Sequence, residues 1–160
     1  MAVSVAMYDK SYDHIGDRLN ALGLDIEVLT FDRDGEFHKG SKAVSPAEID
    51  VDYLWLSTHL NADNAQSMAF ELAMSCKSIG VMQTFNAGLD NPVYKKISDK
   101  GVRICNSSAQ AVAISEYTMA HVLSLLHPID EQRDQQARKE WKMAPFREIW
   151  RTNWLIIGYG

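Results

Sequence analysis

The chain has 160 residues, 46% of them hydrophobic, and a formal net charge of −5 at pH 7. This apolar content can form a core and excludes a disordered chain. The negative charge and the lack of a long basic run disfavour nucleic-acid binding. No apolar run approaches the ~20 residues of a membrane span. The two cysteines have no metal-ligand spacing. We therefore expect a cytoplasmic protein with no membrane or nucleic-acid partner and no metal.

Strand-like and helix-like segments alternate along the first 106 residues, which favours an α/β fold with a parallel sheet. Strands are expected at 3–8, 25–31, 53–57, 78–83 and 102–105. Helices are expected at 12–22, 63–76 and 92–100, with one further turn opened by a capping box at 45–48. The polar residues 32–44 are expected to form a loop. Five parallel strands in the order 2-1-3-4-5 predict a flavodoxin-like sheet.

The pattern changes after residue 106. Residues 110–126 form a predicted helix that is apolar nearly all round, which requires cover on more than one side. The predicted helix at 129–140 is strongly polar. Aromatic residues then crowd together in a way that is typical of an interface, namely Trp141, Phe146, Trp150 and Trp154. We expect a first domain at 1–106 and the beginning of a second at 107–160, with helices and a first strand from Trp154.

Ligands of open parallel sheets bind beyond the carboxyl ends of the strands. This rule selects three segments as candidate binding residues: 57–59, 85–88 and 106–108. His59 lies in the first of them, but a lone histidine in a loop is more often unremarkable than catalytic. The second segment is rich in small residues, which let backbone N–H groups approach an anion closely. It can equally be an ordinary strand-to-helix turn capped by Asp90 or Asn91.

Three motifs occur in a fixed order along the chain. They are Asn86-Ala87-Gly88-Leu89-Asp90-Asn91, Gly101-Val-Arg-Ile-Cys-Asn106 and Val112-Ala-Ile-Ser-Glu116-Tyr-Thr. Together they resemble the D-isomer-specific 2-hydroxyacid dehydrogenases, and the closing Trp-Leu-Ile-Ile-Gly-Tyr-Gly looks like the start of that family's cofactor loop. The chain departs mildly from the family at three positions. Glycine is common at the position of Asn86, a different small residue at that of Ala87, and alanine at that of Ser115.

The resemblance implies an oxidoreductase that interconverts a 2-oxo acid and a D-2-hydroxy acid with NAD or NADP. It implies that the backbone N–H groups of Ala87 and Gly88 bind the substrate carboxylate, with Thr58 and Gln110 beside the cleft. Gly158 and Gly160 would approach the cofactor pyrophosphate. The family's catalytic arginine, acidic residue and histidine follow that loop, so no catalytic residue is expected within these 160 residues and the chain alone is expected to be inactive. A homodimer is also implied, and residues 107–160 are implied to be the helices and first strand of a truncated, NAD(P)-binding Rossmann domain.

Two alternatives stay open. The first is a non-catalytic, truncated module that keeps the substrate-binding domain and a dimer interface. The second is an independent flavodoxin-like signalling or binding domain that ends near residue 106. A receiver-like version of that domain needs several acidic residues after the first strand, where the sequence offers Asp9. The oxo acid and the choice between NAD and NADP are not specified by the sequence.

Overall fold

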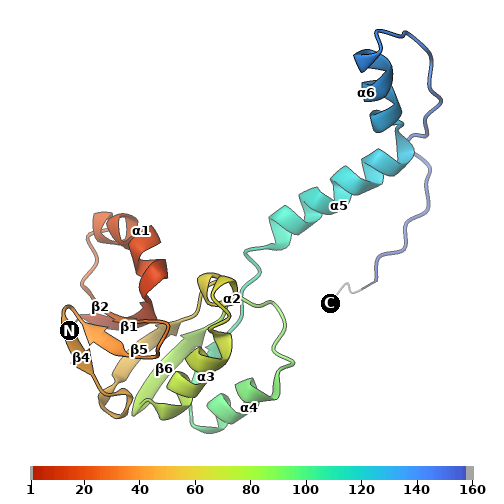
Figure 1. Ribbon diagram of the computed structural model, residues 1–160. Coiled ribbons are helices and arrows are strands. Elements are labelled where there is room, and N and C mark those ends of the chain that lie inside the picture. Colours follow the sequence, from red (N-terminus) through yellow and green to blue (C-terminus); the bar gives the residue numbers. More distant parts are fainter. Residues whose placement is uncertain (1, 158–160) are drawn as a thin grey trace. The chain divides into compact units, whose positions relative to one another are not determined.

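The computed structural model describes residues 2–157. The chain divides into two compact units, Met1–Ala109 and Gln110–Gly160, which we describe separately and call unit 1 and unit 2 (Figure 1). The division follows the change in sequence pattern, since an alternating α/β segment precedes it and two successive helices follow it. No helix among the described residues is long and apolar enough to cross a membrane.

Unit 1 is built on one sheet with the strand order β4-β3-β2-β1-β5-β6-β7. The five expected strands are present and mutually parallel: β1 (Val3–Tyr8), β2 (Ile26–Phe31), β5 (Asp50–Trp55), β6 (Ser78–Gln83) and β7 (Arg103–Cys105). Their relative order corresponds to the expected 2-1-3-4-5. The parallel arrangement gathers the carboxyl ends of these strands at one edge, which is where a ligand site is expected.

The expectation of a five-stranded, wholly parallel sheet is wrong, because the sheet has seven strands and is mixed. The segment expected to be a loop forms a hairpin of β3 (Phe37–Lys39) and β4 (Lys42–Val44), and β3 pairs antiparallel to β2. Gly40, at the first central position of the two-residue turn, has a φ of +61°, a conformation that glycine adopts readily. Phe37 is fully buried and contacts Phe31 edge to face, so one apolar residue anchors the polar hairpin.

The helices of unit 1 are α1 (Asp9–Ala21), α2 (His59–Ala62), α3 (Gln66–Ser75) and α4 (Pro92–Asp99), with the 3-10 turn η1 (Pro46–Glu48). The predicted capping box is wrong in detail, because the Ser45 side chain accepts no capping hydrogen bond. The helix expected from Asp63 begins at Gln66, after the separate turn α2. Asn91 caps α4 as anticipated, with its side chain accepting a 3.0 Å bond from the Val93 amide.

A row of buried apolar residues crosses one face of the sheet. Ala6, Leu29, Leu54 and Met82 occupy one row across four strands and are all buried. This row belongs to a single apolar cluster with α3 and α4, to which Phe70 and Tyr94 contribute an edge-to-face ring contact. Those two helices therefore fix β6, and with it the start of the segment that joins β6 to α4.

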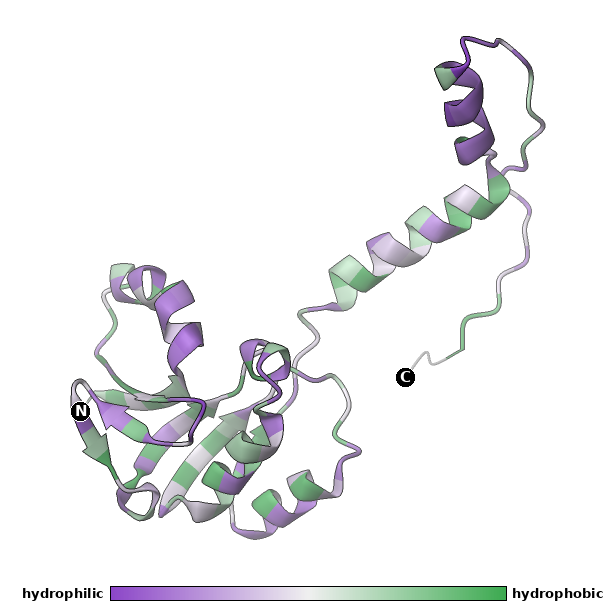
Figure 2. Cartoon of the chain, in the orientation of Figure 1, coloured by the Kyte–Doolittle hydropathy of each residue, from purple (hydrophilic) through white to green (hydrophobic). Residues whose placement is uncertain are grey.

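Unit 2 contains α5 (Ala111–Leu126) and α6 (Ile129–Ala137). Figure 2 shows hydrophobic residues along the whole of α5, yet none of its residues is buried. Gln135 and Ala144 are the buried residues among the described part of unit 2. The strand expected from Trp154 is wrong for the described residues 154–157, which are exposed and irregular. Gly158 and Gly160, expected to bind the cofactor, lie outside the described residues.

Candidate functional site

The best candidate site is the turn between β6 and α4, which we call the 84–91 turn. It begins with Thr84, which is buried and uses its hydroxyl to close a small polar ring. The Thr84 Oγ1 accepts a hydrogen bond from the Asn86 amide and donates one to the Asn86 carbonyl, both at 3.2 Å. The Asn86 side chain in turn donates to the Tyr94 hydroxyl at 2.7 Å, which ties the turn to α4.

Two amide side chains hold the turn, one from the end of β6 and one from the residue after the neighbouring strand β7. Gln83 Nε2 donates to the carbonyls of Thr84, at 2.8 Å, and Asn106, at 3.0 Å. Asn106 Nδ2 donates to the Ala87 carbonyl at 2.8 Å, and the Ser107 amide donates to the Asn86 carbonyl at 3.1 Å. These bonds satisfy the carbonyl oxygens of Thr84, Asn86 and Ala87 and fix the direction of their peptide planes.

The amides of Ala87 and Gly88 are left free. Both residues are exposed, and neither N–H group donates a hydrogen bond to any acceptor within residues 2–157. A Cβ atom at Gly88 would meet nothing but the Asp90 side chain, with Oδ2 at 3.1 Å, and Gly88 is not in a positive-φ conformation. The glycine is thus not required by strain, but its lack of a side chain keeps the two donors open to a ligand.

An anion is the ligand that two exposed, fixed backbone N–H groups bind best. Asp90 opposes such binding, because its carboxylate lies beside Gly88 and repels negative charge. Asn91 performs the ordinary capping role of a strand-to-helix turn. The capped-turn interpretation and the anion-binding interpretation therefore apply to different groups of the same segment and do not exclude each other.

Thr58 lies at the carboxyl end of β5, the strand next to β6, and its side chain is exposed. Its neighbour Ser57 is buried, and the Ser57 hydroxyl lies 2.5 Å from that of Ser11 in α1. His59 Nδ1 lies 3.3 Å from Ser11 Oγ, and the His59 ring lies edge to face with that of His14 at 5.7 Å between centroids. The same sheet edge thus carries a second polar cluster.

A third group joins the end of β1 to the loop after α2. The Tyr8 hydroxyl donates to Asp63 at 2.6 Å, and the Lys10 ammonium group forms an ion pair with the same carboxylate at 2.7 Å. The bond from Lys10, followed by that from Tyr8, holds the pKa of Asp63 below its usual value of 3.8. Burial, followed by the bond to Asp63, raises the pKa of Tyr8. The group is ionic, internally paired and therefore structural.

Gln110 begins unit 2 as the residue before α5, is exposed, and forms no side-chain capping bond. The candidate residues that one sheet edge brings together are therefore Thr58, Ala87 and Gly88. Sequence reasoning missed the supporting roles of Gln83 and Asn106. A signal existed for both, since each is a polar residue at the carboxyl end of a predicted strand.

Comparisons with known proteins give no assignment: no family model, no curated protein and no solved structure matches this chain.

Proposed function

We propose that the chain is part of an NAD- or NADP-dependent D-2-hydroxyacid dehydrogenase and that Ala87 and Gly88 bind the carboxylate of its 2-oxo or 2-hydroxy acid substrate. The observation that carries the proposal is that the N–H groups of Ala87 and Gly88, with others of the 84–91 turn, are exposed and donate no hydrogen bond within the described residues, at the carboxyl edge of the five parallel strands. The motifs at 86–91, 101–106 and 112–118 support the same family from the sequence.

The chemistry assigned to these residues is binding and orientation. Hydrogen bonds to a charged group contribute about 1.5–3 kcal/mol each, so two backbone donors can hold a small carboxylate weakly and in one orientation. Holding the carboxylate would orient the rest of the substrate at the sheet edge to which Thr58 also belongs. The nicotinamide cofactor supplies the hydride when bound, and the residues proposed for its phosphates, Gly158 and Gly160, lie outside the described residues. We expect no catalytic residue in this chain.

The binding step can be tested by titrating the chain with pyruvate while following backbone amide resonances by NMR. The largest shifts are expected at Ala87 and Gly88, with an apparent Kd near 1 mM, which corresponds to about −4 kcal/mol. Pyruvamide, which has the same shape without the charge, should cause much smaller shifts. Equal responses to the two compounds, or shifts centred elsewhere, would contradict carboxylate binding at this turn.

A matched pair of variants tests the location. Gly88→Val places a branched side chain over the two donors and should weaken pyruvate binding at least tenfold. Lys96→Ala removes an exposed positive charge from α4 without touching the turn, and it should leave binding within a factor of two. If Lys96→Ala weakens binding as much as Gly88→Val, the anion is attracted by general surface charge. No turnover of pyruvate with NADH is expected from the 160 residues alone.

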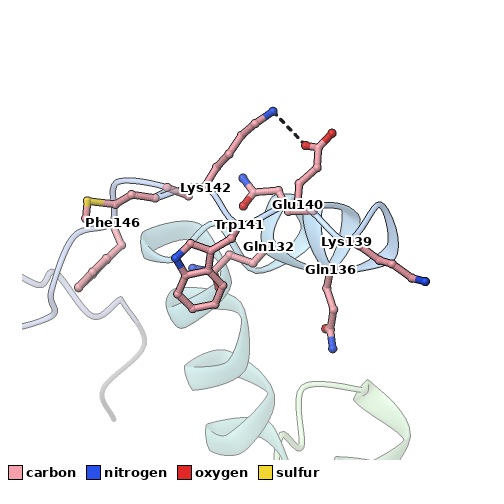
Figure 3. A pocket seen from close by; sticks show the side chains of 10 residues that line it. Gln132, Gln136, Lys139, Glu140, Trp141, Lys142 and Phe146 are labelled. Atoms are coloured by element: carbon pink, nitrogen blue, oxygen red, sulfur yellow. Dashed lines mark hydrogen bonds and ion pairs between the residues drawn. The ribbon is translucent and has the colours of Figure 1, made fainter.

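A second candidate function is association without catalysis, and α5 favours it. Val112, Ile114, Tyr117 and Leu125 are each more than half exposed. The hollow between α6 and residues 139–146, of about 650 Å³, adds Trp141 and Phe146 to this uncovered apolar surface (Figure 3). Large exposed apolar patches mark interaction surfaces.

We propose that unit 2 forms the homodimer interface. Sedimentation velocity at several concentrations should then show a defined dimer, and Leu125→Glu should convert it to a monomer. His14→Gln, an exposed change in unit 1, is the control and should leave the dimer intact. A monomer at every concentration, or an open series of aggregates, would refute the proposed interface.

A further inference from the structure

The residues around the β2–β3 junction carry a second feature that the dehydrogenase proposal does not use. Asp32 directly follows β2, Glu36 directly precedes β3, and His38 lies within β3. One potential ligand atom from each of these three side chains lies within 4.8 Å of the other two. The set combines an imidazole nitrogen with two carboxylates, which is the mixed donor set that zinc and related divalent ions bind in proteins.

The closest pair already has the spacing of two ligands on one ion. His38 Nε2 lies 3.2 Å from Asp32 Oδ2. Two ligand atoms at about 2.0–2.2 Å from a tetrahedral Zn²⁺ ion are about 3.3–3.6 Å apart, so an ion can enter between these two atoms with little displacement. Glu36 is exposed, and rotation of its side chain can supply a third oxygen.

The backbone holds the ligands in place before any ion binds. Asp32 Oδ1 accepts hydrogen bonds from the amides of Asp34 and Glu36, each at 2.9 Å, which orients the carboxylate and leaves Oδ2 for an ion. His38 is paired on both sides, with Thr30 in β2 and Ala43 in β4. Pre-oriented ligands lose little conformational freedom on binding, which increases affinity.

The local charge also favours a cation. Asp32 and Glu36 place two carboxylates close together, and no lysine or arginine among residues 2–157 forms an ion pair with either. The side chain that pairs with Asp32 is that of His38, which is itself a proposed ligand. A divalent ion compensates both carboxylates, and the nitrogen ligand selects a transition metal over Mg²⁺ or Ca²⁺, which prefer oxygen ligands.

We propose that Asp32, Glu36 and His38 form a binding site for one divalent transition-metal ion of the zinc class, with water completing the coordination. Binding joins the end of β2 to the β3–β4 hairpin and stabilises unit 1. In the strand order, β2 and β3 lie on one side of β1, and β6, which leads to the 84–91 turn, lies on the other. A negative result for metal binding therefore leaves the proposed carboxylate binding unaffected.

The full chain should be titrated with Zn²⁺ by calorimetry in a chelator-free buffer and with Co²⁺ by visible absorption. We expect one ion per chain, Co²⁺ bands of a site with mixed nitrogen and oxygen ligands, and a higher Tm with Zn²⁺. Mg²⁺ at the same concentration should give no heat and no change in Tm. Equal binding of Mg²⁺, or absence of Zn²⁺ binding up to 1 mM (on the order of −4 kcal/mol), would overturn the proposal.

Variants locate the ion. His38→Gln should weaken Zn²⁺ binding about 100-fold and Glu36→Gln about 10-fold, since the loss of supporting residues alone costs 10–100-fold in metal sites. Glu36 is exposed, so Glu36→Gln is expected to fold even if His38→Gln does not. His14→Gln and Glu71→Gln, both exposed changes away from the three proposed ligands, are the matched controls and should bind Zn²⁺ as the unaltered chain does. Undiminished binding by Glu36→Gln and by folded His38→Gln would place the ion elsewhere.

Discussion

Unit 1 and unit 2 use their apolar residues in opposite ways. In unit 1 the strands and helices bury them against each other, and Leu54, Leu56 and Met82 are at most 1% exposed. In unit 2 the most apolar helix of the chain has no buried residue, and Leu125 is 85% exposed. Unit 1 therefore contains its own folding core, whereas unit 2 has the composition of a core without the neighbours that would make it one.

Apolar residues therefore have two roles in this chain: they form a core in unit 1 and an exposed surface in unit 2. Apolar surface removed from water contributes about 25 cal/mol per Å², wherever the covering group comes from. Unit 1 obtains this stabilisation within the chain. For α5 it remains to be obtained from another surface, which is why we assign association to unit 2 and ligand binding to unit 1.

The largest expected effect is on the free energy of unfolding, and it tests the difference between the two units directly. Leu54→Ala, in the core of unit 1, should lower the free energy of unfolding by about 2–5 kcal/mol, because it removes buried contacts and leaves a cavity. Leu125→Ala in α5 should change it by less than about 0.5 kcal/mol in the monomer. Urea denaturation at low protein concentration measures both. A large loss in Leu125→Ala would mean that α5 is covered within the monomer.

The second prediction compares a polar contact of unit 1 with one of unit 2. Tyr8→Phe removes the bond to Asp63 and should lower stability by about 1–2 kcal/mol at pH 7. Asp63 has a lowered pKa, so its contribution is complete above pH 3.8 and is lost as the pH falls through the lower folded value. The difference between Tyr8→Phe and the unaltered chain should therefore shrink in urea titrations below that pH.

Asp130→Asn in α6 is the control for this comparison. The Asp130–Arg133 pair is 3.6 Å long and both side chains are at least three-quarters exposed, so its loss should not be measurable. A pH-independent difference for Tyr8→Phe would show that packing, and not the bond to Asp63, accounts for its effect.

A smaller effect is expected from the exposed amide side chain of Asn106. Asn106→Ala removes the bond to the Ala87 carbonyl and should destabilise unit 1 by about 1 kcal/mol. It should also weaken pyruvate binding several-fold, because the peptide planes of the 84–91 turn lose a support. Asn20→Ala, an exposed change in α1, is the control and should change neither quantity. Equal behaviour of the two variants in denaturation and NMR titration would remove Asn106 from the site.

The smallest effect concerns charge at the same turn. Asp90→Asn removes a negative charge beside Gly88 and should strengthen pyruvate binding by a factor of about two to three at low salt. The gain should disappear as ionic strength rises. Glu71→Gln, an exposed change in α3, is the control and should leave the affinity unaltered at every salt concentration. Weaker binding by Asp90→Asn would mean that Asp90 supports the turn.

Much of unit 1 was predictable from the sequence because its signals are local. Apolar runs identified the five parallel strands, and Asn91 before Pro92 identified the start of α4. The β3–β4 hairpin was missed because its strands are three residues long and mix apolar with charged residues, so no periodicity could be seen. Gly40-Ser41 is the turn signal that could have revealed it.

The candidate site was partly predictable for the same reason. The strand-end rule located Thr58, Ala87 and Gly88, which the structure places at one edge. The Asp32–Glu36–His38 group was not predictable, because it depends on the hairpin that brings His38 back beside Asp32. The residues from Trp154 were expected as a strand on their composition, but a strand also requires a neighbour to pair with, and composition does not supply one.

The two outermost strands of the sheet in unit 1 affect aggregation at high protein concentration. An outermost strand leaves its N–H and C=O groups unpaired and can add the strand of another molecule, which begins fibrous aggregation. Here β4 and β7 are each three residues long, and they carry Lys42 and Arg103. Short, positively charged borders repel their own copies. Growth of strand upon strand is thereby disfavoured, and contacts between molecules are left to the helical part of the chain.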